Sequence, residues 1–250
     1  MHFEVKGNGP PVVLITGLGG LGSFWQPIME RLADDFTCIT FDHPGVGRSP
    51  PPVTHTIEGI ARGVIALLDQ LGIASAHLVG HSTGGLVAQV LALDHAARTG
   101  RVVLSATWAR PDRHFRDLFE LRRTVLERAG FGAYNAMGKL LGYPAGWYES
   151  HFAPARSIDF DVDAPGDKAP VVARINMLLG FDRSAELANI RPPVLVLGAS
   201  DDNLVPVHHS RDLARRIAGA SLVEMQGGHF FPHVVTGQYC ETLRQFLAAS

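Results

Sequence analysis

Short apolar runs alternate with amphipathic stretches along most of this chain, and this alternation restricts its fold more than any other feature. The run at 12–15 has the length and residue types of a buried strand, and further strands are predicted at 36–41, 77–79, 101–105, 194–198 and 221–225. The stretches with helical periodicity lie at about 23–33, 56–71, 84–95, 207–217 and 234–248. Strands that alternate with helices predict an α/β fold, with a mostly parallel central sheet and helices on both faces.

The alternation stops near residue 108 and resumes near residue 190. More than half of the aromatic residues fall in this interval, its periodicity is helical, and no comparable strand-like run occurs in it. The stretch 159–170, rich in Asp, Pro and Gly, is expected to be an exposed loop, not a calcium site. We therefore predict an α/β core formed by residues 1–107 and 191–250, with a helical cap subdomain inserted over 108–190.

Composition and charge exclude several classes of function. Hydrophobic residues make up 46% and charged residues 18% of the chain, which favours a large buried core over disorder. The formal net charge is −2 and no block of like charges occurs, so neither nucleic acid nor a membrane is expected as a partner. We expect a small-molecule substrate, and a homodimer remains open.

Neither a targeting signal nor a disulfide framework is predicted. The first residues lack a charged stretch followed by an apolar core, and no run of 18 apolar residues occurs. Cys38 and Cys240 are far apart in sequence and are expected to be buried free thiols. The default expectation is a cytoplasmic protein.

The segment Gly80-His81-Ser82-Thr83-Gly84-Gly85 lies between a predicted strand and a predicted helix. It fits G-x-S-x-G, in which a serine occupies a sharp, strained turn and side chains two residues to either side would collide. The start of the next helix favours negative charge, and the N–H of Thr83 is directed at the position where an oxyanion would form. Glycine-rich turns also produce this pattern, so the strand–turn–helix context is what supports Ser82 as a nucleophile.

Two later strands end in loops that carry acidic and basic candidates. The first loop contains Asp201 and Asp202, and the next contains His229 after two glycines. Because the C-terminal ends of parallel strands open on one edge of the sheet, both loops are expected on the edge that carries Ser82. We predict that His229 accepts the serine proton and that Asp202 orients it, with Asp201 as the alternative.

The glycine-rich loop after the first strand permits two interpretations. Beside a nucleophile, such a loop supplies a second oxyanion N–H, here that of Leu18. The loop also spells G-x-G-x-x-G, and Asp42 follows about twenty residues later, as in a dinucleotide-binding site. However, Pro27 suits a helix start better than a position one turn into a helix, and Asp42 is followed by a turn-rich segment. A dinucleotide site would also leave the Ser82 and His229 loops unexplained, so no cofactor is predicted.

Five ordered segments together resemble the successive motifs of the α/β-hydrolase superfamily. They are Ile15-Thr16-Gly17-Leu18-Gly19-Gly20, Phe41-Asp42-His43-Pro44-Gly45-Val46-Gly47-Arg48-Ser49, Gly80-His81-Ser82-Thr83-Gly84-Gly85, Ala199-Ser200-Asp201-Asp202-Asn203-Leu204-Val205-Pro206 and Gly227-Gly228-His229. The resemblance covers essentially the whole chain apart from the cap. It implies an α/β-hydrolase fold, and the position of Asp202 four residues before Pro206 matches the acid of that family.

Within the superfamily, the chain is most similar to the aminoacrylate (carbamate-type) hydrolases of pyrimidine utilisation, followed by the 3-oxoadipate enol-lactonases. The segments 17–25, 142–147 and 199–202 carry that likeness. Members of the first group do not all keep a serine nucleophile, so Ser82 favours ordinary esterase or lactonase chemistry.

The function predicted from these residues is that of a serine hydrolase acting through a Ser82–His229–Asp202 triad and an acyl-enzyme. The bond cleaved would be a small ester, lactone or carbamate/amide-type carbonyl bond, as in aminoacrylate hydrolase. The alternatives are an enol-lactonase-like lactonase, a carbon–carbon hydrolase, a perhydrolase and a ligand receptor of the same fold. This chemistry requires neither a metal nor an organic cofactor.

The cap and the loops around Ser82 are expected to form the substrate pocket. Its predicted lining is Gly17, His81, Trp108, Phe119, Tyr143, Trp147 and Phe230. The cap also carries several arginines, among them Arg110, Arg113, Arg122, Arg123 and Arg174. The resemblance to enol-lactonases implies that one of them turns inward to select a substrate carboxylate, and the sequence does not indicate which.

Overall fold

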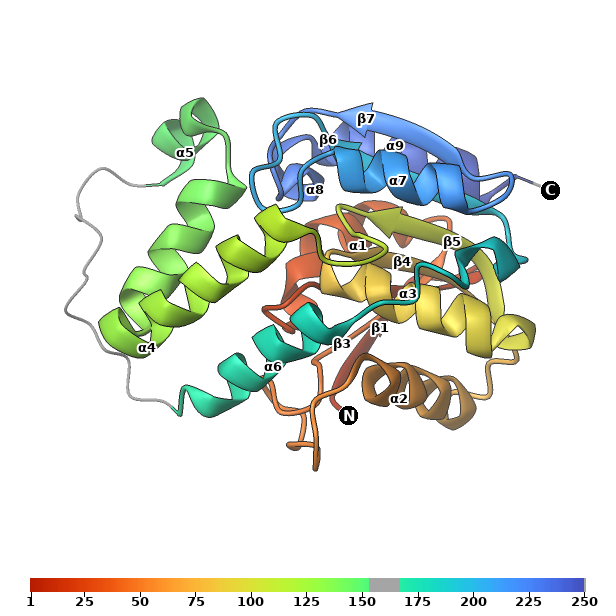
Figure 1. Ribbon diagram of the computed structural model, residues 1–250. Coiled ribbons are helices and arrows are strands. Elements are labelled where there is room, and N and C mark those ends of the chain that lie inside the picture. The colour runs from red at the N-terminus through yellow and green to blue at the C-terminus, as the bar shows by residue number, and fades with distance from the viewer. Residues whose placement is uncertain (153–166, 250) are drawn as a thin grey trace.

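The computed structural model describes residues 1–152 and 167–249 and has a seven-stranded sheet at its centre (Figure 1). The strands are β1 (Phe3–Lys6), β2 (Pro11–Ile15), β3 (Thr37–Phe41), β4 (Ala76–His81), β5 (Thr99–Ser105), β6 (Val194–Ala199) and β7 (Ser221–Met225). Their spatial order is β1-β3-β2-β4-β5-β6-β7, and only β1 is antiparallel to its neighbour. The predicted mostly parallel sheet is confirmed, and the apolar runs missed only β1, whose residues are largely exposed.

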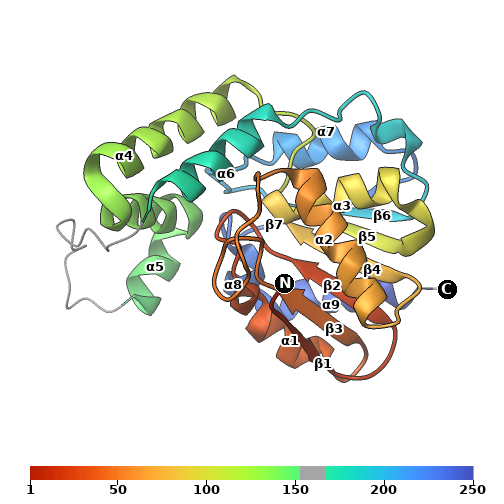
Figure 2. The ribbon, with the colours of Figure 1, turned by 90° about the horizontal axis from the view of Figure 1, so that it is seen from below.

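Helices connect the strands and cover both faces of the sheet. They are α1 (Gln26–Leu32), α2 (Ile57–Gln70), α3 (Thr83–Asp94), α4 (Arg113–Gly142), α5 (Ala145–His151), α6 (Ala169–Gly180), α7 (His208–Arg216), α8 (Phe231–Val234) and α9 (Thr236–Leu247). Short 3-10 turns lie at Gly22–Trp25, Ala96–Arg98 and Leu187–Asn189. Helices α1 and α9 cover one face, and α2, α3 and α7 cover the other (Figure 2).

Two apolar clusters hold these layers together. In β2, Val13 and Ile15 belong to the cluster under α2 and α3, whereas Val12 and Leu14 belong to the cluster under α1 and α9. Successive side chains of a strand point to opposite faces, so a continuous apolar run is buried on both sides. The first turn of α2 is held by Thr56, whose side chain accepts a hydrogen bond from the N–H of Gly59, as predicted for its N-cap.

Between β5 and β6, the described residues form helices and no strand. In both ribbon views α4 and α5 project beyond the sheet, and α6 returns alongside α4 (Figures 1 and 2). Helix α4 bends at Gly130, where φ is 79°. The loop expected over 159–170 lies mostly outside the described residues, and α6 already begins at Ala169. This arrangement agrees with a helical cap, and the boundaries at 107/108 and 190/191 remain a prediction.

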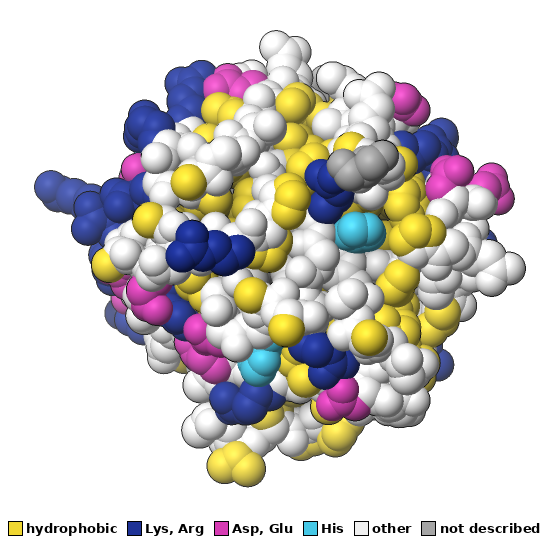
Figure 3. Space-filling view, turned by 90° about the vertical axis from the view of Figure 1, so that its right-hand side faces the viewer, with side chains coloured by type: hydrophobic (Ala, Val, Ile, Leu, Met, Phe, Trp, Pro, Cys, Tyr) yellow, Lys and Arg dark blue, Asp and Glu magenta, His cyan; other side chains and the backbone are white. Residues whose placement is uncertain are grey.

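The face of the core that points away from the cap carries charges of both signs. In Figure 3 acidic and basic side chains are interspersed over this face, with apolar and uncharged surface between them. None of the helices in the described ranges is long and apolar enough to cross a membrane. Cys38 and Cys240 are buried free thiols, as predicted.

Candidate active site

Ser82 lies at the turn between β4 and α3 in a conformation that few residues adopt. Its φ is 55° and its ψ is −118°, and its N–H donates to the carbonyl of Ser105 at 2.8 Å. Such a backbone conformation costs free energy and is retained where the surrounding structure enforces it, which is typical of functional sites. A Cβ built on Gly80 would lie 2.2 Å from the carbonyl oxygen of Gly84, so the turn closes only because glycine occupies that position.

Replacing Gly84 with alanine is expected to destabilise the protein by about 3 kcal/mol or more, because the new methyl group would overlap backbone. The added Cβ would lie 2.0 Å from the carbonyl oxygen of Ile15, which cannot move without breaking β2. Urea denaturation would measure the loss. Gly146→Ala in α5 is the control, since its Cβ would meet nothing within 4 Å, and it should be neutral or slightly stabilising. Equal stability of the two variants would contradict the close packing inferred for the turn.

His229 and Asp202 form a buried pair. The Nδ1 atom of His229 lies 2.8 Å from Oδ2 of Asp202, and both residues are only 5% exposed. The other carboxylate oxygen, Oδ1, accepts hydrogen bonds from the N–H groups of Leu204 and Val205, each at 2.8 Å. With Asp202 as a fixed acceptor, Nδ1 carries a proton and Nε2 is the free acceptor of the ring. This is the orientation that a general base requires.

Asp201 faces a different part of the site. Its carboxylate accepts hydrogen bonds from the N–H groups of Gly227 and Gly228 at 3.0 Å. These two glycines precede His229 and have φ values of 128° and 64°. Asp201 therefore holds the loop that carries the histidine, whereas Asp202 contacts the histidine ring itself. This geometry favours Asp202 over Asp201 as the triad acid.

The glycine-rich loop after β2 lies against Ser82. A Cβ built on Gly17 would lie 3.2 Å from Cβ and 3.6 Å from Oγ of Ser82, so Gly17 is part of the immediate surroundings of the hydroxyl. Leu18 follows it, and Thr83 is the first residue of α3, where the helix leaves backbone N–H groups without helical partners. The predicted oxyanion donors thus lie on the two segments that flank Ser82.

The sequence-predicted pocket residues fall into two groups. The first group is a chain of ring contacts next to His229. The rings of His81 and Phe230 lie 5.0 Å and 5.4 Å from the His229 ring. Tyr143 lies 4.7 Å from Phe230, and Trp147 stacks on Tyr143 at 4.5 Å. Trp108 and Phe119 form the second group. Both pack on Phe115 at 4.3 Å in the large core cluster between cap and core. They pack the cap against the core, and their ring contacts do not include His229. That they line the pocket stays a prediction.

Phe24 is a residue of this site that sequence reasoning missed. Its ring stacks on His81 at 5.2 Å and on His233 at 4.3 Å, and its carbonyl oxygen lies 2.7 Å from Nε2 of His233. It belongs to a 3-10 turn that follows the glycine-rich loop. No spacing rule connects residue 24 with residue 233, so only the tertiary structure reveals that Phe24 packs on His81 and His233.

Asp42, the acid of the dinucleotide pattern, is engaged by the backbone. Its Oδ1 accepts from the N–H of Gly22 at 2.9 Å and its Oδ2 from the N–H of Arg48 at 3.0 Å. Pro27 lies in the first turn of α1, after a 3-10 turn, as the argument against a dinucleotide site assumed. Asp42 thus joins the glycine-rich loop to the loop after β3.

The fold and the site together define a class of protein. A mostly parallel sheet carries a serine on a strained strand-to-helix turn, and the loops after β6 and β7 supply a paired aspartate and histidine. The family profile described as alpha/beta hydrolase fold matches residues 10–234. The chain therefore belongs to the α/β-hydrolase family, and it is a hydrolase.

More specific similarity extends over nearly the whole chain. It is 37% identical over 258 residues to a protein of Caulobacter sp. (strain K31) named "Putative carbamate hydrolase RutD", covering 99% of this chain and 96% of the relative. A protein of the same name from Variovorax paradoxus (strain S110) is 38% identical over 243 residues, covering 93% and 88%. Among solved structures, the enol-lactonase from Burkholderia xenovorans LB400 superposes with a TM-score of 0.88 at 29% identity, covering 99% of this chain and 96% of that chain. The resemblance to these two groups is confirmed.

Proposed function

We propose that this protein is a serine hydrolase that cleaves a small ester, lactone or carbamate-type carbonyl bond in a substrate with an anionic group. The observation that carries the proposal is the buried His229–Asp202 pair, whose imidazole ring lies 5.0 Å from the ring of His81, the residue before the serine on the strained turn. The similarity to carbamate hydrolases and to an enol-lactonase supports a small carbonyl substrate.

The reaction proceeds in two halves. Nε2 of His229 takes the proton of Ser82 as the oxygen attacks the carbonyl carbon, and Asp202 stabilises the imidazolium that forms. The N–H groups of Leu18 and Thr83 bind the oxyanion. His229 then gives its proton to the leaving group, and an acyl or carbamoyl group remains on Ser82. A water molecule deprotonated by His229 attacks this group, and the serine is released with its proton restored.

Arg174 supports an anionic substrate group. It comes from α6 in the cap, is only 5% exposed, and donates a hydrogen bond to the carbonyl of Leu18 in the loop beside Ser82. A Cβ on Gly20 would lie 2.6 Å from its Nη2, so the guanidinium rests directly on this loop. Burial lowers the pKa of Arg174 to about 10, which leaves it protonated at neutral pH.

Arg122 is a second buried cation in the cap. It is 8% exposed, lies 5.1 Å from the Phe119 ring and 4.9 Å from the Tyr134 ring, and its Nε has no hydrogen-bond partner in the described chain. Within the described residues, neither Arg122 nor Arg174 has a carboxylate oxygen within 4.0 Å. A buried charge without a counter-ion is costly, and an anionic ligand would relieve that cost.

Among the described residues, the titratable groups near Arg174 do not neutralise it. His43 is fully enclosed, and burial followed by the charge of Arg174 lowers the pKa of His43 to about 3. Burial and Arg174 also lower the pKa of His55. Both histidines are therefore neutral at neutral pH, and the positive charge of Arg174 beside the glycine-rich loop is available to a substrate carboxylate.

The substrate class can be tested with a matched panel. Short-chain aryl esters, small lactones and a carbamate would be assayed, each as a free carboxylate and as its neutral methyl ester. Higher kcat/KM for the carboxylates is the expected result, and the preferred bond type would separate carbamate from lactone chemistry. Turnover of neutral compounds alone would contradict the anionic substrate, and no turnover of any compound would favour a ligand receptor.

Arg174→Met is expected to lower kcat/KM for the carboxylate substrates by about 30-fold or more, equivalent to about 2 kcal/mol, because it removes a buried ion pair with the substrate. The neutral esters should change only a few-fold. Arg113→Met is the control, since Arg113 lies on α4 with its side chain 94% exposed. Equal losses for charged and neutral substrates would indicate that Arg174 merely supports the Leu18 loop.

A further inference from the structure

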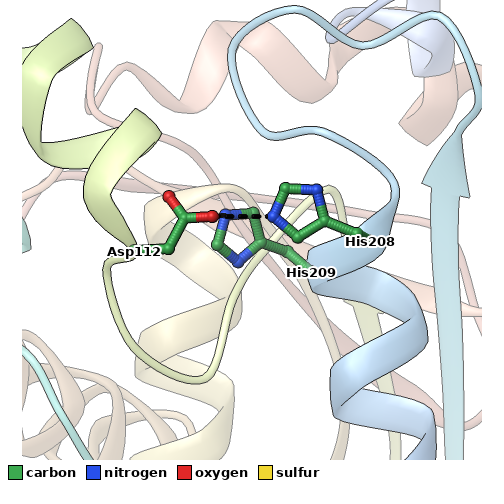
Figure 4. Close-up of side chains that lie close together, drawn as sticks. All are labelled: Asp112, His208 and His209. Atoms are coloured by element: carbon green, nitrogen blue, oxygen red, sulfur yellow. Dashed lines mark hydrogen bonds and ion pairs between the residues drawn. The ribbon is translucent and has the colours of Figure 1, made fainter.

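Three side chains meet where the cap begins and α7 begins. Nε2 of His208 lies 2.7 Å from Oδ2 of Asp112, and Nε2 of His209 lies 3.4 Å from the same oxygen. One ligand atom from each residue lies within 4.8 Å of the other two. Figure 4 shows the two imidazole rings and the carboxylate turned toward one another across the gap between α4 and α7.

His209 has a buried nitrogen that makes no hydrogen bond with the described residues. The residue is 5% exposed, and its Nε2 makes no hydrogen bond within the described part of the chain, although it lies near Asp112. A buried ring nitrogen left unsatisfied costs free energy, so its direction toward two other ligand-type atoms calls for a partner that the described residues do not supply.

The carboxylate of Asp112 is held in place from the other side. Asp112 is the N-cap of α4, and its Oδ1 accepts a hydrogen bond from the N–H of Phe115 at 2.8 Å. Only Oδ2 faces the histidines. A ligating carboxylate fixed by a second hydrogen bond is the usual arrangement around protein metal ions.

We propose that Asp112, His208 and His209 bind a divalent transition-metal ion of the Zn²⁺ type. Two imidazole nitrogens and one carboxylate oxygen suit such an ion, whereas Mg²⁺ and Ca²⁺ prefer oxygen ligands alone. In a tetrahedral zinc site, ligand atoms lie about 3.3 Å apart, close to the present separation of Asp112 and His209. Nε2 of His208 must move outward from its present 2.7 Å, and its side chain, which is 55% exposed, is not enclosed by the protein.

The metal site would link the start of the cap to the start of α7, two segments that the catalytic residues do not link. Asp112 starts the first cap helix, and His208 and His209 start the helix after the Asp202 loop. A metal bound there closes a loop of about a hundred residues and anchors the cap to the core next to that loop. Its expected role is structural, and it is independent of the proposed reaction.

Isothermal titration of the full chain with ZnCl₂, after removal of any histidine tag and of chelators, tests the proposal. We expect one ion per chain with a Kd on the order of 10 µM or tighter. Free Zn²⁺ at a hundred times the Kd should raise Tm by about 5 °C or more. No heat of binding and no Tm shift up to 1 mM Zn²⁺ would show that the three residues form only a hydrogen-bonded cluster.

Two variants assign the site to these residues. Asp112→Asn removes the charged ligand and keeps an N-cap for α4, and His208→Ala removes an exposed ring. Each should weaken Zn²⁺ binding at least tenfold and abolish the Tm shift, while the metal-free variants remain folded by circular dichroism. His151→Ala, an exposed histidine of α5, is the control and should bind as the wild type does. Unchanged affinity in both ligand variants would overturn the proposal.

Discussion

Replacing Ser82 with alanine is expected to lower kcat by about 10⁶-fold on any substrate of the panel, because no acyl-enzyme can form. Alanine keeps the Cβ of serine and adds no atoms, so the strained turn meets no new contact. Initial rates of wild type and variant, with the uncatalysed rate subtracted, measure the effect. An acyl adduct detected by mass spectrometry on a peptide containing Ser82 would identify the nucleophile directly.

The control for this variant is its ability to bind. A product carboxylate should bind Ser82→Ala about as tightly as it binds wild type. The substitution leaves the buried arginines Arg122 and Arg174, the rings around His229 and the two proposed oxyanion N–H groups unchanged. A variant that is as active as wild type would exclude Ser82 as the nucleophile. A wild type that binds the panel without turnover would favour a receptor function.

Asp202→Asn is expected to reduce kcat by about 10⁴-fold with little change in KM. The asparagine oxygen can still accept from the N–H groups of Leu204 and Val205, so the loop keeps its shape. The other side-chain atom becomes a donor, which favours the wrong tautomer of His229 and cannot stabilise an imidazolium. The size of the effect therefore reports the orienting role rather than a folding defect.

Asp201→Asn is the matched comparison one residue away. It weakens the hydrogen bonds to Gly227 and Gly228 from charged to neutral and should cost about 1–2 kcal/mol of stability, with kcat reduced by tenfold or less. Urea denaturation and steady-state kinetics on both variants separate the two roles. If the large loss of kcat appeared in Asp201→Asn and not in Asp202→Asn, the assignment of the acid would be reversed.

Local patterns in the sequence accounted for most of the core. The five inner strands, β2 to β6, contain buried apolar runs, because a strand covered on both faces has little polar surface. The edge strands β1 and β7 are largely unburied, and β1 lacks the apolar signal altogether. The turn at Ser82 was also predictable, since both the strain at the serine and the crowding around Gly80 and Gly84 arise within a few residues of chain. Because the C-terminal ends of parallel strands open on one edge of the sheet, the His229 loop could be placed on the edge that carries Ser82.

Only the tertiary structure decided the remaining parts of the site. It separated Asp201 from Asp202, because hydrogen bonds to the β7 loop and not adjacency determine their roles. It brought Arg174 to Leu18 in the glycine-rich loop, 156 residues away, and it stacked Phe24 on His81 beside the site. It also joined Asp112 to His208, 96 residues apart. Periodicity and short motifs indicate which way a side chain points within its own helix or strand. The contacts of Asp201, Arg174, Phe24 and Asp112 depend instead on how whole helices, strands and loops pack against one another.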